Sequence, residues 1–72
     1  MEAGIAVIGE DSRVRAYALV GASVWPADDA AGVRAAWAAL GPRVRLVILT
    51  EAAARALPEA VAGGERLVAV MD

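Results

Sequence analysis

Four short apolar runs are spaced along this 72-residue chain, and a stretch with helical spacing follows each of the first three. Runs of this length, apolar on both faces, are typical of parallel strands buried between helices. The alternation therefore predicts a single α/β domain over residues 1–72 with the element order βαβαβαβ. The four predicted strands cover residues 4–8, 22–25, 44–49 and 67–71.

The segment after the first predicted strand carries the start and stop signals of a helix. Asp11 or Ser12 is the expected N-cap, because short polar side chains accept hydrogen bonds from the first free backbone N–H groups. Val14, Tyr17 and Ala18 share one face of this helix. Gly21 is the residue expected to end it.

Two further helices are expected later in the chain. Over residues 28–40, an apolar stripe at i, i+4 and i+7 predicts an amphipathic helix, and its members are Val33, Trp37 and Leu40. Thr50 is the expected cap of a third helix over residues 51–57. Pro58 then either kinks this helix or begins a new turn at its first position.

The alternating pattern favours the flavodoxin-like or Rossmann-like strand order 2-1-3-4, with right-handed crossovers between the parallel strands. The first helix then covers one sheet face alone, and the other two helices cover the opposite face. A complete sheet of this type has a terminal helix beside the first one, and none follows the fourth strand in this sequence. Apolar side chains of the third and fourth strands are therefore expected to be partly bare: Val44, Leu46, Val47, Ile48, Val68 and Val70. Such a face indicates either a contact surface or a chain that lacks its C-terminal part.

Composition narrows the possible chemistry. The chain has no Cys and no His, which excludes disulfides and the usual ligands of zinc, haem and iron–sulfur clusters. The net charge is −2 and the basic residues are scattered arginines, so no nucleic-acid or lipid-headgroup surface is expected. The longest uncharged run, residues 16–27, is too short to span a bilayer. The sequence predicts a soluble, cytoplasmic protein with no direct membrane insertion.

Polar residues gather where the first and third strands end, at Glu10, Asp11, Thr50 and Glu51. Carboxylates at this position suit Mg²⁺, and the arrangement resembles that of response-regulator receiver domains. However, Thr50 stands where a receiver has its phosphoryl-accepting Asp, and the chain has no Lys. Helix capping explains the same residues without chemistry. A receiver-like module that binds Mg²⁺ or a phosphorylated ligand near Glu10, Asp11 and Thr50 therefore stays as the alternative function.

Catalysis is not expected. The chain contains neither of the glycine-rich nucleotide motifs, GxGxxG or GxxxxGK[ST]. Its Ser, Thr and Tyr hydroxyls have no His or Lys that could serve as a general base. We assign no catalytic, cofactor-binding or metal-binding residues.

The opening of the chain resembles the F subunit of the V-type/A-type rotary ATPases (ATP synthases). Residues 6–11, AVIGED, match the family's first strand and turn, IAVIGD. The family's next helix reads roughly TVxGFRLAG, and the matching positions here are Val14, Tyr17 (for the family's Phe), Leu19 and Gly21. Residues 47–51 with the Ala-rich segment after them resemble the family's third strand and helix, and residues 67–70 its fourth strand. Ala16 and Ala18 replace the family's Gly and Arg.

The resemblance implies a non-catalytic component of the central stalk, with no cofactor. Such a component binds the coiled-coil D subunit of the stalk and turns with it, coupling ATP turnover to proton or sodium transport. It would lie in the cytoplasm, peripheral to the membrane, with other ATPase subunits as further partners. Combined with the expected bare sheet face, this predicts an interface made of Tyr17, Leu19, Val44, Leu46, Ile48, Val68 and Val70.

Overall fold

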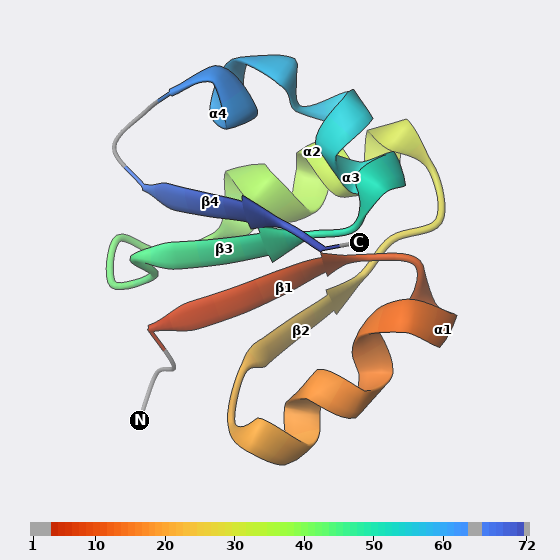
Figure 1. The fold of residues 1–72 in the computed structure, drawn as a ribbon, viewed down its shortest axis with the longest axis vertical. Coiled ribbons are helices and arrows are strands. Elements are labelled where there is room, and N and C mark those ends of the chain that lie inside the picture. Colours follow the sequence, from red (N-terminus) through yellow and green to blue (C-terminus); the bar gives the residue numbers. More distant parts are fainter. Residues whose placement is uncertain (1–3, 64–65, 72) are drawn as a thin grey trace.

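A four-stranded, all-parallel sheet in the order β2-β1-β3-β4 forms the centre of the structure (Figure 1). The computed structural model describes residues 4–63 and 66–71. The predicted α/β class and strand order are confirmed. The strands are β1 (Ile5–Gly9), β2 (Ser23–Pro26), β3 (Leu46–Leu49) and β4 (Leu67–Val70).

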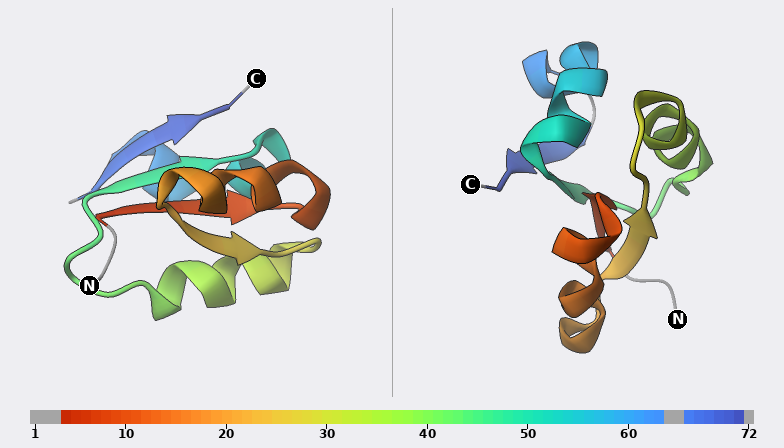
Figure 2. Two further views of the ribbon diagram at one scale, coloured as in Figure 1. Left: turned by 90° about the horizontal axis from the view of Figure 1, so that it is seen from below. Right: turned by 90° about the vertical axis from the view of Figure 1, so that its right-hand side faces the viewer.

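Helices cover the two faces of the sheet unequally. The right-hand view of Figure 2, which looks along the strands, shows α1 and η1 on one side of the sheet and the other helices on the opposite side. Helix α1 contacts β1 and β2, and η1 contacts β2, whereas α3 contacts β1 and β3, and α4 contacts β4. The helices are α1 (Asp11–Val14), the 3-10 helix η1 (Arg15–Val20), α2 (Ala30–Ala39), α3 (Glu51–Ala56) and α4 (Pro58–Ala62).

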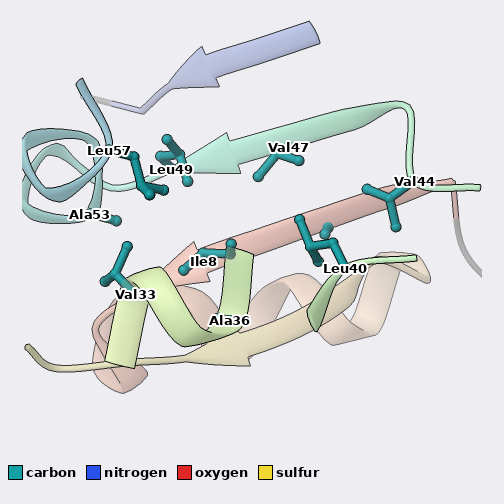
Figure 3. Packing of buried hydrophobic residues seen from close by; sticks show 10 residues of the cluster. Ile8, Val33, Ala36, Leu40, Val44, Val47, Leu49, Ala53 and Leu57 are labelled. Carbon is teal, nitrogen blue, oxygen red and sulfur yellow. The ribbon is translucent and has the colours of Figure 1, made fainter. Parts of the chain in front are cut away.

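The main core lies between the sheet and the α2–α3 layer (Figure 3). Ile8 and Leu49, paired in register on neighbouring strands, are fully buried at its centre. The helices contribute small and medium side chains, and β1 needs apolar residues on both faces because helices lie above and below it. The clustered residues are Ala6, Ile8, Val33, Ala36, Leu40, Val44, Val47, Leu49, Ala53 and Leu57.

The first helical segment differs from the prediction. Its α-helical part ends at Val14, and the chain continues as a 3-10 helix to Val20. With three residues per turn, positions 14, 17 and 20 form the row on one side, so Ala18 is exposed instead of sharing the face of Val14 and Tyr17. The expected stop at Gly21 is confirmed, because this residue has a left-handed φ of 85°.

The predicted N-cap of this segment was wrong. Glu10 occupies the cap position, and its carbonyl oxygen accepts the backbone N–H groups of Arg13 and Val14 at 2.9 and 3.1 Å. No side chain caps the helix. Asp11 is already the first helical residue, and its carboxylate pairs with Arg15 one turn later.

The other helix starts follow the expected chemistry. The Asp29 carboxylate accepts the backbone N–H of Gly32 at 2.7 Å and caps α2. The Thr50 hydroxyl accepts the backbone N–H of Ala53 at 3.3 Å and caps α3, as predicted. Pro58 begins α4 as a separate short helix, so the third predicted helix is two helices joined at Leu57.

Strand alternation corrects the expected set of bare side chains. Val47 and Leu49 face the α2–α3 layer, and their register partners Val68 and Val70 face the same side. Val44 lies in the loop before β3 and is buried in the same core, only 6% exposed. Among the expected residues of β3 and β4, only Leu46 and Ile48 face the side that carries η1.

Candidate functional site

The carboxyl ends of β1 and β3 meet at a direct contact between Glu10 and Thr50. Thr50 Oγ1 donates a hydrogen bond of 2.5 Å to Glu10 Oε1, and its oxygen also accepts from Ala53. Thr50 is fully buried, whereas Glu10 is half-buried. The donor of the hydroxyl and one of its two acceptor positions are therefore already used within the protein.

This contact changes the acidity of Glu10. The hydrogen bond from Thr50 lowers the pKa of the Glu10 carboxyl, because it stabilises the charged form. The positive charges of Arg13 and Arg55 act in the same direction, more weakly. Glu10 is therefore held as a carboxylate, oriented toward the end of β3.

The other acids expected at this site point elsewhere. Asp11 forms an ion pair with Arg15 and thereby raises the pKa of that guanidinium. Glu51 pairs with Arg55 along α3, with 3.9 Å between the charged atoms. The structure thus brings Glu10 and Thr50 together but leaves Asp11 and Glu51 engaged within their own helices.

A small cavity of about 110 Å³ lies beside Glu10, between the first residues of α2 and α3. Asp28 and Asp29 line it together with apolar side chains. Both acids already accept backbone N–H groups: Asp28 from Asp11 at 3.3 Å and Asp29 from Gly32. Within residues 4–63 and 66–71, no three acidic side chains come close enough to hold a metal ion together. This end of the sheet is organised mainly as a set of helix starts.

Apolar side chains are exposed on the side of the sheet that carries η1. Leu19 and Val20 are 89% and 78% exposed, and Ile5 at the start of β1 is 42% exposed. A hollow of about 260 Å³ has Ile5, Tyr17, Val20 and Ile48 in its wall and no charged lining residue, and Leu19 lies beside it without lining it. We call this area the η1 surface, defined by Ile5, Tyr17, Leu19, Val20 and Ile48.

The predicted interface residues fall into two groups. Tyr17, Leu19 and Ile48 belong to the η1 surface, and half-buried Leu46 lies on the same sheet face. The remaining three lie on the opposite side: Val44 in the core, Val68 packed against it, and Val70 exposed by 42% at its edge. The structure therefore places four of the seven residues on the expected side of the sheet and three on the other side. Contact of any of them with a partner stays a prediction.

Arg66 was missed at the sequence level, although it joins three parts of the fold. Its guanidinium donates to the carbonyl oxygens of Val44, Leu40 and Gly41 at 3.1, 3.4 and 2.8 Å. It also lies over the ring of Trp37, 5.4 Å from the centroid. The residue just before β4 therefore holds the end of α2 and the loop into β3. A single Arg in a Gly-rich turn gives no local signal of this role.

Trp37, expected in the core, is only half-buried. It packs against the core cluster and lines an open hollow of about 410 Å³ between α2 and α4, with Arg34 and Glu59 among the other lining residues. Trp25 on β2 also packs against the core, and its indole N–H donates to Ser23 Oγ at 3.0 Å.

Over the described residues, no helix is both long and apolar enough to cross a membrane. Comparisons with protein-family models, with curated proteins and with solved structures give no match to this chain.

Proposed function

We propose that this chain is a non-catalytic component of the central stalk of a V-type/A-type rotary ATPase. In this role it binds the coiled-coil D subunit of the rotor and couples ATP turnover to proton or sodium transport, on the cytoplasmic side of the membrane. Two lines support the proposal: the resemblance of β1, α1 and η1 to the opening of the F subunit, and the exposed apolar η1 surface.

The observation that carries the proposal is the exposure of Leu19 and Val20. These two large apolar side chains, consecutive in the sequence, are 89% and 78% exposed, and Val20 lines an uncharged hollow. Burying one such side chain fully is worth about 1.5–3 kcal/mol, which is a strong driving force for a protein contact. Contiguous exposed apolar patches on a small domain typically mark interaction sites.

A helix of a coiled coil fits this surface. Coiled-coil helices present apolar side chains at regular spacing along one face, and a hollow beside a helix receives such side chains. The wall of the hollow contains only glycines and uncharged residues, so an apolar side chain would enter it without leaving a charge unpaired. The half-buried phenol of Tyr17 at the wall adds an aromatic contact of the type enriched at interfaces.

The test is a calorimetric binding titration of the purified chain with the recombinant coiled coil of the D subunit. We expect a stable 1:1 complex and no nucleotide hydrolysis by the isolated chain. The double variant Leu19→Glu/Val20→Glu should weaken binding by at least about tenfold, the size of effect typical of central interface residues. The matched control is Ala35→Glu/Ala38→Glu, which adds the same charge on the exposed side of α2. Absence of a complex, or equal binding by both variants, would contradict the proposal.

The receiver-like alternative makes a different prediction on the same preparation. It expects heat on titration with Mg²⁺ and a phosphate analogue, and loss of that heat in Asp11→Ala. The placement of Glu10 and Thr50 at the end of the sheet is its support. A flat titration eliminates it, whatever the outcome with the coiled coil.

A further inference from the structure

The outer edge of β4 is unpaired within the described part of the chain. The backbone N–H of Leu67 donates to Arg45 O at 3.0 Å, and that of Met71 donates to Leu49 O at 2.8 Å. The N–H and C=O groups of successive residues point to opposite sides of a strand. The N–H and C=O groups of Val68 and Val70 therefore point away from β3. Figure 2 (right) shows β4 at the margin of the sheet, with no described element beyond it.

This edge lacks the features that prevent strand pairing. Natural edge strands usually carry a charge, a proline or a bulge. Residues 67–71 read LVAVM, without any of these, whereas the opposite edge strand, β2, ends in Pro26. Leu67 and Val70 are 72% and 42% exposed, and Val61 on the neighbouring helix α4 is 44% exposed. Val70 lies on the sheet face that α4 covers, whereas Leu67, the register partner of Leu46, lies on the face that carries η1.

We propose that β4 pairs antiparallel with β4 of a second copy of this chain, across a two-fold axis at Ala69. The two sheets then join into one continuous sheet. This proposal uses a different part of the molecule from the η1 surface, so it does not depend on the proposed stalk function.

The hydrogen-bonding pattern of β4 fits a second copy as the occupant. With Ala69 on the axis, Val68 of one copy lies opposite Val70 of the second copy. By symmetry, Val70 of the first copy lies opposite Val68 of the second. Both residues present their N–H and C=O groups outward, so each pair exchanges two hydrogen bonds and none of the four groups is left over. A two-fold interface needs this self-complementarity, because the same patch serves both subunits.

The side chains also suit this register. In an antiparallel pair, the residues that do not exchange hydrogen bonds come closest, with Cα atoms about 4.5 Å apart. Ala69, the smallest side chain of β4, occupies this position. The flanking Val–Val pairs are β-branched cross-strand contacts of the favourable kind.

Charge does not oppose the pairing. The nearest described charged side chain along the strand, Arg66, is turned back toward the carbonyl oxygens of the α2–β3 connection and the ring of Trp37. No like charges of the described residues therefore face one another at the centre of the joined sheets.

The first test is sedimentation velocity over a wide concentration range. We expect a reversible monomer–dimer equilibrium for the unmodified chain. Ala69→Lys and Ala69→Glu each place two like charges on the axis and should each be monomeric, while an equal mixture of the two should form a 1:1 heterodimer. Ala38→Lys and Ala38→Glu on exposed α2 are the matched controls and should dimerise normally. Because Ala69 is exposed, circular dichroism should show both variants folded.

A second test checks the register by cross-linking, since the chain has no Cys of its own. Ala69→Cys should form an intermolecular disulfide readily, because facing residues at the axis lie within the Cα separation that a disulfide requires. Leu67→Cys should cross-link poorly, because in this register it faces Met71 of the second copy. Three results would overturn the proposal: a monomer at all concentrations, dimers that persist in Ala69→Lys, or open-ended polymers instead of a closed dimer.

Discussion

Thr50 joins the ends of two parallel strands through one hydroxyl group. It donates to Glu10 Oε1 at 2.5 Å and accepts from the backbone N–H of Ala53 at 3.3 Å. The point at which open α/β sheets usually bind ligands is therefore occupied here by contacts between the protein's own residues. Thr50 acts as a cap and as a link between β1 and β3.

This double role predicts different effects for two substitutions. Thr50→Val keeps the shape but removes the cap and the bond to Glu10, so we expect the free energy of unfolding to fall by about 1–2 kcal/mol. Thr50→Ser keeps the hydroxyl and should recover most of that loss. Urea denaturation measures both. Equal stability of the Val and Ser variants would show that the hydroxyl contributes nothing.

The lowered pKa of Glu10 predicts a pH effect on stability. A carboxyl whose pKa in the folded state lies below its ordinary value of 4.5 contributes stability above that value. That contribution is lost as pH falls through the folded-state pKa, because the unfolded chain then binds more protons. We expect a small effect, since Glu10 is only half-buried.

The measurement compares Glu10→Gln with the unmodified chain in urea unfolding across the acidic range. Gln keeps an acceptor for Thr50 and removes the charge, so the stability difference should shrink as pH falls below 4.5. Glu59→Gln, at an exposed position on α4, removes one charge elsewhere and serves as the control. A Glu10→Gln profile parallel to that of the unmodified chain would contradict the prediction.

Gly9 is predicted to tolerate no side chain. A Cβ atom at this position would lie 2.9 Å from Cβ of Thr50 and still closer to the rest of that side chain, all in buried surroundings. Gly9→Ala should therefore destabilise the fold by about 1–3 kcal/mol, the usual cost of overpacking.

Gly4→Ala is the matched control, because the nearest atom to its Cβ, the carbonyl oxygen of Arg43, is 3.9 Å away. Its stability should change by less than about 0.5 kcal/mol. In a Thr50→Gly background the cost of Gly9→Ala should fall, because the atoms in conflict are gone. An unchanged cost in that background would show that the close approach to Thr50 is not its cause.

Arg66 is predicted to stabilise the fold through its planar guanidinium group, whose N–H donors reach several carbonyl oxygens. Arg66→Lys keeps the charge but cannot reach three carbonyl oxygens at once, so we expect a loss of about 1–2 kcal/mol in thermal or urea unfolding. Tryptophan emission should also shift, because Arg66 lies over the ring of Trp37. The control Arg45→Lys, at an exposed position before β3, should change neither quantity. If both variants behave alike, the carbonyl contacts are not stabilising.

The sequence alone was sufficient for the strand order and most of the helix starts. Runs of apolar residues identified the strands to within two residues at each described end, because burial on both faces demands such runs whatever the partners are. The order 2-1-3-4 is the flavodoxin-like arrangement of an alternating βα chain, and the handedness of crossovers, a property of L-amino acids, then assigns the helices to their faces. Thr50 could be identified as a helix start because capping depends on neighbours in the chain, and a new turn at Pro58 was one of two expected alternatives.

The tertiary structure decided what depends on distant residues. Asp11 was expected as a cap but pairs with Arg15, since the preceding residue, Glu10, is held at the end of β3 by Thr50. Val44 and Val68 were expected on the bare face but lie on the core side, because successive strand residues face opposite sides of the sheet and Val44 belongs to the loop before β3. Arg66 reaches carbonyl oxygens more than 20 positions away in the chain, a contact that no local pattern encodes. Local preferences such as helix capping depend on adjacent residues. The sheet face that a side chain occupies and the partner of a charged group are decided only in the folded chain.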